Sequence, residues 1–187
     1  IMDTIRAIEQ RRSIRNFKGN LIPVETIEKL LELATKAPSA RNRQPWRFAV
    51  LQGDKKDKLV EIMTNAAKDY REKNKDFGSL ELSANSIKEA STVVLVFNAL
   101  SNNEKDYNHH KLLADTQSIG AAIENMILAA EDIGLATLWI CDIFYCDKEI
   151  CSWLDRKEEL AAAVAIGYRN QAPHQRPRKD WREVTEW

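Results

Sequence analysis

The sequence predicts an α+β fold, a modest sheet surrounded by helices, and three observations lead to this prediction. Of the 187 residues, 44% are hydrophobic and 30% are charged, a composition that suits one globular domain with a sizeable core. Short apolar segments of strand length alternate with longer segments of helical periodicity. No internal repeat, low-complexity tract or linker divides the chain, so we expect residues 1–187 to form a single domain.

Helical periodicity places five helices along the chain. The longest is apolar on more than one side, which predicts that it is buried against several partners, and Gly134 suits the position just after its end. The second helix follows Pro23 and ends before Pro38, because the residue that precedes a proline avoids the helical conformation. The predicted helices are residues 3–12, with Ile5 and Ile8 on one face; the segment after Pro23, with Ile27, Leu30, Leu31 and Ala34 on one face; and residues 55–76, 111–133 and 147–154.

Four short segments are predicted to be strands, at residues 47–51, 92–98, 137–141 and 161–166. Residues 92–98 are β-branched and apolar throughout, which indicates a strand buried on both faces of the sheet. The tail from Tyr168 onward is rich in proline and charge, so it is expected to run extended over a surface.

Charge and glycine content exclude several kinds of binding protein. Lysine plus arginine equals aspartate plus glutamate at 28 each, so no overall positive field attracts nucleic acid or a membrane. Positive charge is nevertheless concentrated at the two ends of the chain. The six glycines are too scattered to form a glycine-rich phosphate loop, so any phosphate must be held by side chains or a helix N-terminus.

Targeting and redox features predict a cytoplasmic protein. The longest strongly apolar run is residues 93–97, and the N-terminus has no signal-peptide pattern, so neither a membrane span nor a signal peptide is expected. The three cysteines, Cys141, Cys146 and Cys151, are odd in number and have the spacing of neither a disulfide framework nor a zinc site. The pair His109-His110 lacks a third ligand at suitable spacing, so no metal site is predicted.

Three polar segments are candidates for chemistry. Arginine forks and a serine hydroxyl in Arg-Arg-Ser-Ile-Arg (residues 11–15) suit phosphate oxygens, although the segment also reads as a solvated basic turn. The loop Ala-Pro-Ser-Ala-Arg-Asn-Arg-Gln-Pro-Trp-Arg-Phe (residues 37–48) suits a planar polar heterocycle, or it is simply a helix-to-strand connection. Arg-Pro-Arg-Lys (residues 176–179) holds alternate cations in an extended tail and is weak evidence alone.

Taken together, these segments resemble the nitroreductase family of FMN-dependent oxidoreductases. The resemblance adds Gly-Leu-Ala-Thr-Leu-Trp-Ile (residues 134–140) and Gly167-Tyr168, and it covers nearly the whole chain in the family's order and spacing. It implies a mostly antiparallel central sheet and an α+β intertwined homodimer with two FMN molecules at the subunit interface, where neither subunit completes a site alone.

The resemblance also implies which residues meet the cofactor. Arg11, Ser13, Arg176 and Arg178 match positions that grip the FMN phosphate, and Arg12 matches one along the flavin or its ribityl chain. Arg15 matches the cation near flavin N1 and O2, where it stabilises negative charge. The remaining matches are Pro38, Ser39 and Ala40 in the loop from the opposite subunit, Asn42 and Gln44 shaping the pocket, Cys141 and Asp142 with their backbone facing N5 and O4, and either Ser83 or Asn85 at the ring edge.

Three positions depart from the family pattern. Ala40 stands where a hydroxyl residue is common, Ala136 where glycine is common, and Cys141-Asp142 where a glycine or acidic residue followed by glycine is common. Backbone contacts tolerate such changes, so FMN binding is expected to survive while reactivity at N5 differs. Cys141 is interpreted as a small buried filler at a strand end, with a redox thiol as the alternative.

The activity implied is a ping-pong exchange. NADH or NADPH gives hydride to the flavin, and a small acceptor such as a nitroaromatic, a quinone or an activated alkene then collects the electrons. No side chain is assigned as catalytic beyond the electrostatic support of Arg15. The alternatives are a specialised branch such as reductive dehalogenation or flavin breakdown, defined by a lid from residues 65–85 and 98–112; a flavin-binding sensor or scaffold with little turnover; and a non-catalytic binder of another phosphate ligand.

Overall fold

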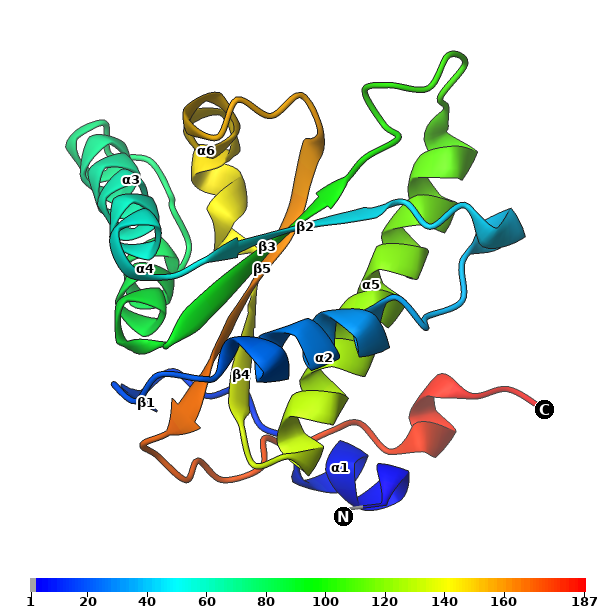
Figure 1. The fold of residues 1–187 in the computed structure, drawn as a ribbon. Helices are drawn as coiled ribbons and strands as arrows, with labels where there is room; N and C mark the ends of the chain where they lie inside the picture. The colour runs from blue at the N-terminus through cyan, green and yellow to red at the C-terminus, as the bar shows by residue number, and fades with distance from the viewer. Residues whose placement is uncertain (1–2) are drawn as a thin grey trace.

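A five-stranded antiparallel sheet forms the centre of the computed structural model, which describes residues 3–187 (Figure 1). The main path of the sheet is β1-β5-β3-β2, and β4 also pairs with β5. The expected antiparallel sheet is therefore confirmed. The strands are β1 (Phe17–Lys18), β2 (Trp46–Leu51), β3 (Thr92–Asn98), β4 (Ala136–Ile140) and β5 (Glu159–Arg169).

Helices cover both faces of this sheet, and β3 shows why. Its side chains alternate between two cores: Val93, Leu95 and Phe97 belong to the core on the side of α3, α4 and α6, and Val94 and Val96 to the core on the side of α2 and α5. All seven residues of β3 are buried, as its apolar sequence predicts. The helices are α1 (Thr4–Gln10), α2 (Val24–Ala34), α3 (Gly53–Glu72), α4 (Leu80–Glu89), α5 (His109–Asp132) and α6 (Asp147–Trp153), with short 3₁₀ segments η1 (Ala40–Asn42), η2 (Asp142–Cys146) and η3 (Trp181–Val184).

The helix α5 is the long buried helix that the sequence predicts. The side chain of Asn108 caps its start by accepting a hydrogen bond from the Lys111 amide at 3.1 Å. Its end is the expected glycine turn, because Gly134 has a φ of +79°, a conformation that favours glycine, and the Leu135 amide returns to the Ala130 carbonyl at 2.8 Å.

The region between β2 and β3 differs from the sequence prediction. The helix expected at residues 55–76 is present as α3, which ends at Glu72, and it is followed by a second helix, α4, which the sequence analysis missed. Lys56 ties the two together, since its buried ammonium donates to the carbonyls of Lys88 at 2.6 Å and Ala90 at 2.8 Å at the end of α4. Burial lowers the pKa of Lys56, and the carbonyls it meets are those left unpaired where a helix ends.

The two ends of the chain lie side by side. The tail after β5 runs past the bottom of the sheet to α1 and then to η3 (Figure 1), and Arg12 Nη2 donates to Gln175 Oε1 at 3.3 Å. In α1 only Ala7 is buried, whereas Ile5 and Ile8 are exposed, so its apolar face is not covered within this chain. Among residues 3–187, no helix is both long and apolar enough to cross a membrane.

Candidate functional site

The segment after α1 is fixed at one buried residue and presents its polar side chains on either side. Ile14 is fully buried, and its amide donates to the Thr137 carbonyl on β4 at 2.9 Å. Ser13 forms an isolated bridge with the same threonine. Since Ser13 and Arg15 flank the buried Ile14 and are exposed, this attachment points the polar residues away from the core.

The tail brings a second set of arginines to this segment. Arg11, Arg12, Ser13 and Arg15 from the N-terminal side line one cavity of about 480 Å³ together with Arg176 and Arg178 from the tail. We call this the arginine cavity; its other lining residues are Ile8, Glu9, Glu124, Pro173, His174 and Gln175. The five residues that the sequence analysis assigned to the phosphate and ribityl region are thus brought together, and Arg15, assigned to flavin N1 and O2, lies with them.

The arginine cavity carries an excess of positive charge. Five arginines line it against two carboxylates, Glu9 and Glu124. Within residues 3–187, none of these five guanidinium groups forms an ion pair. Arg12 is turned toward the backbone, where it donates to the carbonyls of Glu9 at 2.7 Å and Arg11 at 2.8 Å. Unpaired guanidinium groups that converge on one cavity are suited to an anion such as phosphate.

The loop of residues 38–44 lies between α2 and β2 and has an unusual backbone. Arg41, Asn42 and Gln44 all have a positive φ, of 50°, 55° and 47°. Ser39 closes the loop, since its Oγ accepts from the Gln44 amide at 3.0 Å and its carbonyl accepts from the Asn42 amide at 2.9 Å. The left-handed conformation is disfavoured for arginine and glutamine, so contacts of the loop must hold it.

This loop forms a pocket with α5. Pro38, Ser39 and Ala40 face α5 across a cavity of about 250 Å³. The helix contributes the small or polar side chains of Ala114, Gln117, Ser118 and Ala121. Gln44 lines a different hollow, beside Trp46 and Phe48, and Asn42 is exposed. The loop residues assigned from sequence are therefore divided between two surfaces.

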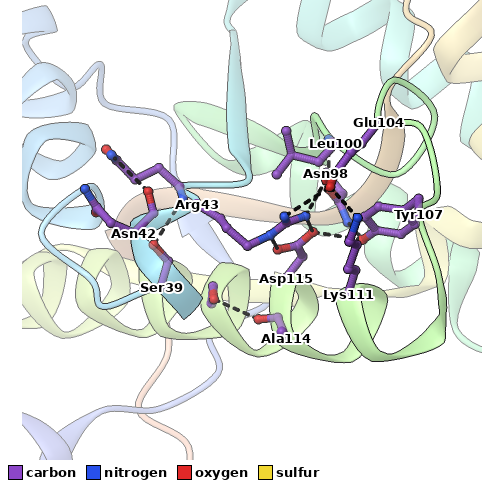
Figure 2. Close-up of polar contacts among 12 residues, drawn as sticks. Ser39, Asn42, Arg43, Asn98, Leu100, Glu104, Tyr107, Lys111, Ala114 and Asp115 are labelled. Atoms are coloured by element: carbon purple, nitrogen blue, oxygen red, sulfur yellow. Dashed lines mark hydrogen bonds and ion pairs between the residues drawn. The ribbon is translucent and has the colours of Figure 1, made fainter.

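Arg43, which the sequence analysis did not single out, fastens this loop to α5 (Figure 2). Its Nε and Nη2 donate to the two carboxylate oxygens of Asp115 at 2.8 and 2.9 Å, and Nη2 also reaches Glu104 at 2.7 Å. Asp115 is fully buried and accepts a further hydrogen bond from the Tyr107 hydroxyl at 3.0 Å. The partners of Arg43 are 61 and 72 residues away in the chain, so no local pattern could have revealed them.

Glu104 is held by two cations. Arg43 donates to it from one side, and Lys111 Nζ on α5 donates from the other at 2.5 Å. Hydrogen bonds from these two groups, with that of Arg43 the larger effect, lower the pKa of Glu104 from its ordinary value of 4.5 to about 2. Hydrogen bonds to Asp115 and then to Glu104 raise the pKa of Arg43, so the Arg43–Glu104 pair stays charged at neutral pH.

Cys141 and Asp142 lie where β4 ends and η2 begins. Cys141 follows the last residue of β4 and is exposed, so the expectation of a buried filler is wrong. The Asp142 carboxylate accepts from the Ser79 hydroxyl at 2.6 Å and the Ser83 hydroxyl at 2.9 Å, which ties this turn to α4. Ser83 is thus engaged with Asp142, and Asn85 is exposed. Desolvation of the thiol and the charge of Asp142 raise the pKa of Cys141, which keeps it protonated at neutral pH and disfavours a reactive thiolate.

The chain is similar in sequence to proteins of one family over most of its length. A sequence model described as "Nitroreductase family" matches residues 8–168. The chain is 30% identical over 182 residues to YfhC of Bacillus subtilis, which is assigned as an NAD(P)H nitroreductase, covering 94% of this chain and 89% of that protein. It is 24% identical over 180 residues to the iodotyrosine deiodinase of Thermotoga neapolitana, covering 92% and 91%.

The fold is also similar to that of a solved flavoprotein structure. A crystal structure from Desulfovibrio desulfuricans, assigned as a nitroreductase and in complex with FMN, is similar with a TM-score of 0.76 and 28% identity. The match covers 99% of this chain and 96% of that one. The structural likeness therefore extends over all the elements that position the arginine cavity, the loop of residues 38–44 and the Cys141-Asp142 turn.

Proposed function

Because the chain belongs to the nitroreductase family, we propose that it is an FMN-dependent oxidoreductase that uses NADH or NADPH to reduce a small acceptor. The observation that carries this proposal is the arginine cavity, where five guanidinium groups meet and none of them forms an ion pair among residues 3–187. The FMN complex of the Desulfovibrio relative supports the choice of cofactor. When bound, FMN accepts hydride at N5 from the reduced nicotinamide and passes the electrons to the acceptor in a ping-pong exchange.

The phosphate of FMN is assigned to the arginine cavity. Arg11 and Ser13 grip it from the N-terminal side, and Arg176 and Arg178 grip it from the tail, so the two basic ends of the chain share one anion. Arg12, held by backbone carbonyls, lies along the ribityl chain. The residues fit the group, because a phosphate dianion supplies the negative charge that the cavity's own two carboxylates do not balance.

The remaining assigned residues surround the ring. Arg15 is placed near N1 and O2, where a cation stabilises developing negative charge. The backbone of Cys141 and Asp142 faces N5 and O4, and the two serines that hold Asp142 keep this turn fixed. The loop with Pro38, Ser39 and Ala40 completes the pocket from a second subunit, and Asn42 and Gln44, on the other surface of the same loop, shape its edge.

A homodimer is part of the proposal for two reasons. In one chain, the arginine cavity and the pocket beside residues 38–40 are separate cavities with no lining residue in common, so one subunit does not enclose a single flavin site. Large apolar side chains are also exposed where a partner could cover them, at Ile5 on α1, Leu113 on α5 and Trp181 in the tail. Aromatic residues of the tail suit anchoring across a partner subunit.

The acceptor is proposed to be a nitroaromatic, a quinone or a related oxidised compound, as the assignment of YfhC suggests. A second candidate is reductive dehalogenation. The observation that favours it is the likeness to the Thermotoga deiodinase, which covers 92% of this chain. Both activities would use the same cofactor site, and they differ in what the segments at residues 65–85 and 98–112 admit.

The test is to purify the protein, record its absorbance spectrum with and without added FMN, and mix the loaded protein anaerobically with NADH and with NADPH. We expect bound flavin to be bleached by at least one nucleotide and to recover on addition of a quinone or a nitroaromatic. An iodinated phenol as acceptor distinguishes the second candidate. A protein that FMN cannot reconstitute would refute the proposal, and one that stays oxidised with both nucleotides would instead favour a flavin-binding sensor.

A further inference from the structure

Arg43 joins three parts of the chain that are far apart in sequence (Figure 2). It belongs to the loop of residues 38–44; Asp115 belongs to α5; and Glu104 belongs to the connection between β3 and α5. Tyr107 extends the contact, because its hydroxyl donates to Asp115 and accepts from the Asn98 amide at 2.8 Å at the end of β3. One guanidinium therefore holds the loop, the connection and the helix together.

All three nitrogens of the Arg43 guanidinium form hydrogen bonds. Nε and Nη2 each donate to one oxygen of the buried Asp115 carboxylate. The Glu104 carboxylate accepts from Nη2 at 2.7 Å and from Nη1 at 3.4 Å. A lysine carries the same charge but has a single nitrogen, so it can keep the attraction without fixing the orientation. The contacts of Arg43 therefore fix the orientation of the two carboxylates as well as balancing their charge.

The loop requires such a fastening. Two of the three residues with a left-handed backbone, Arg41 and Gln44, are types that seldom adopt it, and they flank Arg43 closely. The hydrogen bonds within the loop, from the amides of Asn42 and Gln44 to Ser39 and from the Arg43 amide to the Ala40 carbonyl, close it on itself but do not attach it to the helix. The described side-chain attachment of the loop to α5 is that of Arg43.

Asp115 lies beside the residues of α5 that face the loop. Ala114, Gln117 and Ser118 line the pocket opposite Pro38 and Ser39, within one turn of Asp115. A shift of the Arg43 contact would therefore move the loop relative to the helical wall of the same pocket. In the proposed dimer this pocket contributes the flavin contact made from the opposite subunit.

We propose that Arg43 is a positioning residue, which locks residues 38–44 and residues 99–108 onto α5 as one unit and so sets the wall of the flavin pocket. The proposal rests on the proposed function for its cofactor, but the locking itself concerns the FMN-free chain. Arg43 reaches the flavin only through the loop residues it holds. The connection of residues 99–108, expected to belong to an active-site lid, is thereby coupled to the loop that meets the ring.

Amide hydrogen exchange of the FMN-free protein tests the locking directly. The variants are Arg43→Lys, which keeps the charge, and Arg43→Met, which removes it. Arg47→Met is the matched control, because Arg47 is exposed and forms no ion pair within residues 3–187. We expect exchange to rise on the order of 10-fold in residues 38–44 and 99–108 together for Arg43→Lys, with the sheet unchanged. The control should leave both segments as in the wild type.

Flavin binding then tests the consequence. For Arg43→Lys we expect FMN to bind about 10-fold more weakly and its absorbance bands to shift, while KM for the nicotinamide changes less than kcat. Exchange that rises in only one of the two segments would overturn the coupling. Unchanged flavin affinity and spectrum in Arg43→Lys would overturn the positioning role. A wild-type protein that binds no FMN would instead refute the proposed function, and the two results are distinguishable.

Discussion

Two groups of arginines in this chain have opposite surroundings. Arg43 is matched by Glu104 and the buried Asp115, and its side chain is only 20% exposed. The five arginines of the arginine cavity have no ion-pair partner among residues 3–187, although eleven ion pairs form elsewhere in that part of the chain. A guanidinium whose charge is already balanced serves the structure, and one whose charge is not balanced is available to a ligand.

The first prediction tests this contrast by removing cavity arginines. In Arg11→Ala with Arg178→Ala, we expect FMN affinity to fall on the order of 100-fold, because two charge-assisted contacts to the phosphate are lost. The fold should persist, since neither side chain carries an ion pair within residues 3–187. Fluorescence titration with FMN measures the affinity, and circular dichroism checks the fold.

The control for the double variant is Arg182→Ala. Arg182 also belongs to the basic tail, but it is paired with Asp180 at 3.2 Å and stacks on Trp181 at 4.7 Å. We expect FMN affinity in this variant to stay within a few-fold of the wild type. If the control weakens FMN as much as the double variant does, the phosphate is not held by the arginine cavity.

The elements that sequence could predict are those whose pattern is local. The strand at residues 92–98 follows from its apolar run, and the end of α5 follows from Gly134, whose positive φ only glycine adopts readily. The helix α4 was missed although Leu80, Ala84 and Ile87 stand at helical spacing, because a long charged segment precedes it. Local periodicity found one helix there and could not set its end.

The candidate site divides in the same way. The arginine cavity was predicted as a site for phosphate from the motif resemblance, and the structure brings its members together. The contact of Arg43 with Asp115 depends on how α5 packs beside the loop, which no spacing in the sequence reports. Ile5 and Ile8 show the related limit, because helical spacing identifies an apolar face but not the surface that covers it.

The second prediction concerns the free energy of unfolding. Loss of Arg43 should lower it more than loss of an arginine from the arginine cavity. Arg43→Met leaves the Asp115 carboxylate buried with Tyr107 as its remaining side-chain donor. We expect a loss of about 2 kcal/mol, below the value for a fully buried pair because Arg43 is partly exposed. Arg11→Ala should change stability by less than about 0.5 kcal/mol, as a surface substitution does. Urea unfolding of the FMN-free proteins measures both, and equal losses in the two variants would contradict the comparison.

The third prediction uses pH to isolate Glu104, and its effect is the smallest. The pKa of Glu104 is about 2 in the folded chain against an ordinary value of 4.5. A carboxylate with a lowered folded pKa contributes stability that is complete above its unfolded pKa and is lost as pH falls through its folded pKa. The advantage of the wild type over Glu104→Gln should therefore hold from pH 7 to about pH 5 and shrink steadily from about pH 4.5 toward pH 2.

The matched control for this titration is Glu28→Gln, because Glu28 is exposed on α2 and forms no ion pair within residues 3–187. Urea unfolding of the FMN-free proteins at intervals of pH gives the two difference curves. The Glu104 difference should bend below pH 4.5, while the Glu28 difference stays flat. Parallel flat curves would mean that Arg43 and Lys111 do not hold the Glu104 carboxylate in solution, and the connection of residues 99–108 would then be free to move independently of the loop that Arg43 holds.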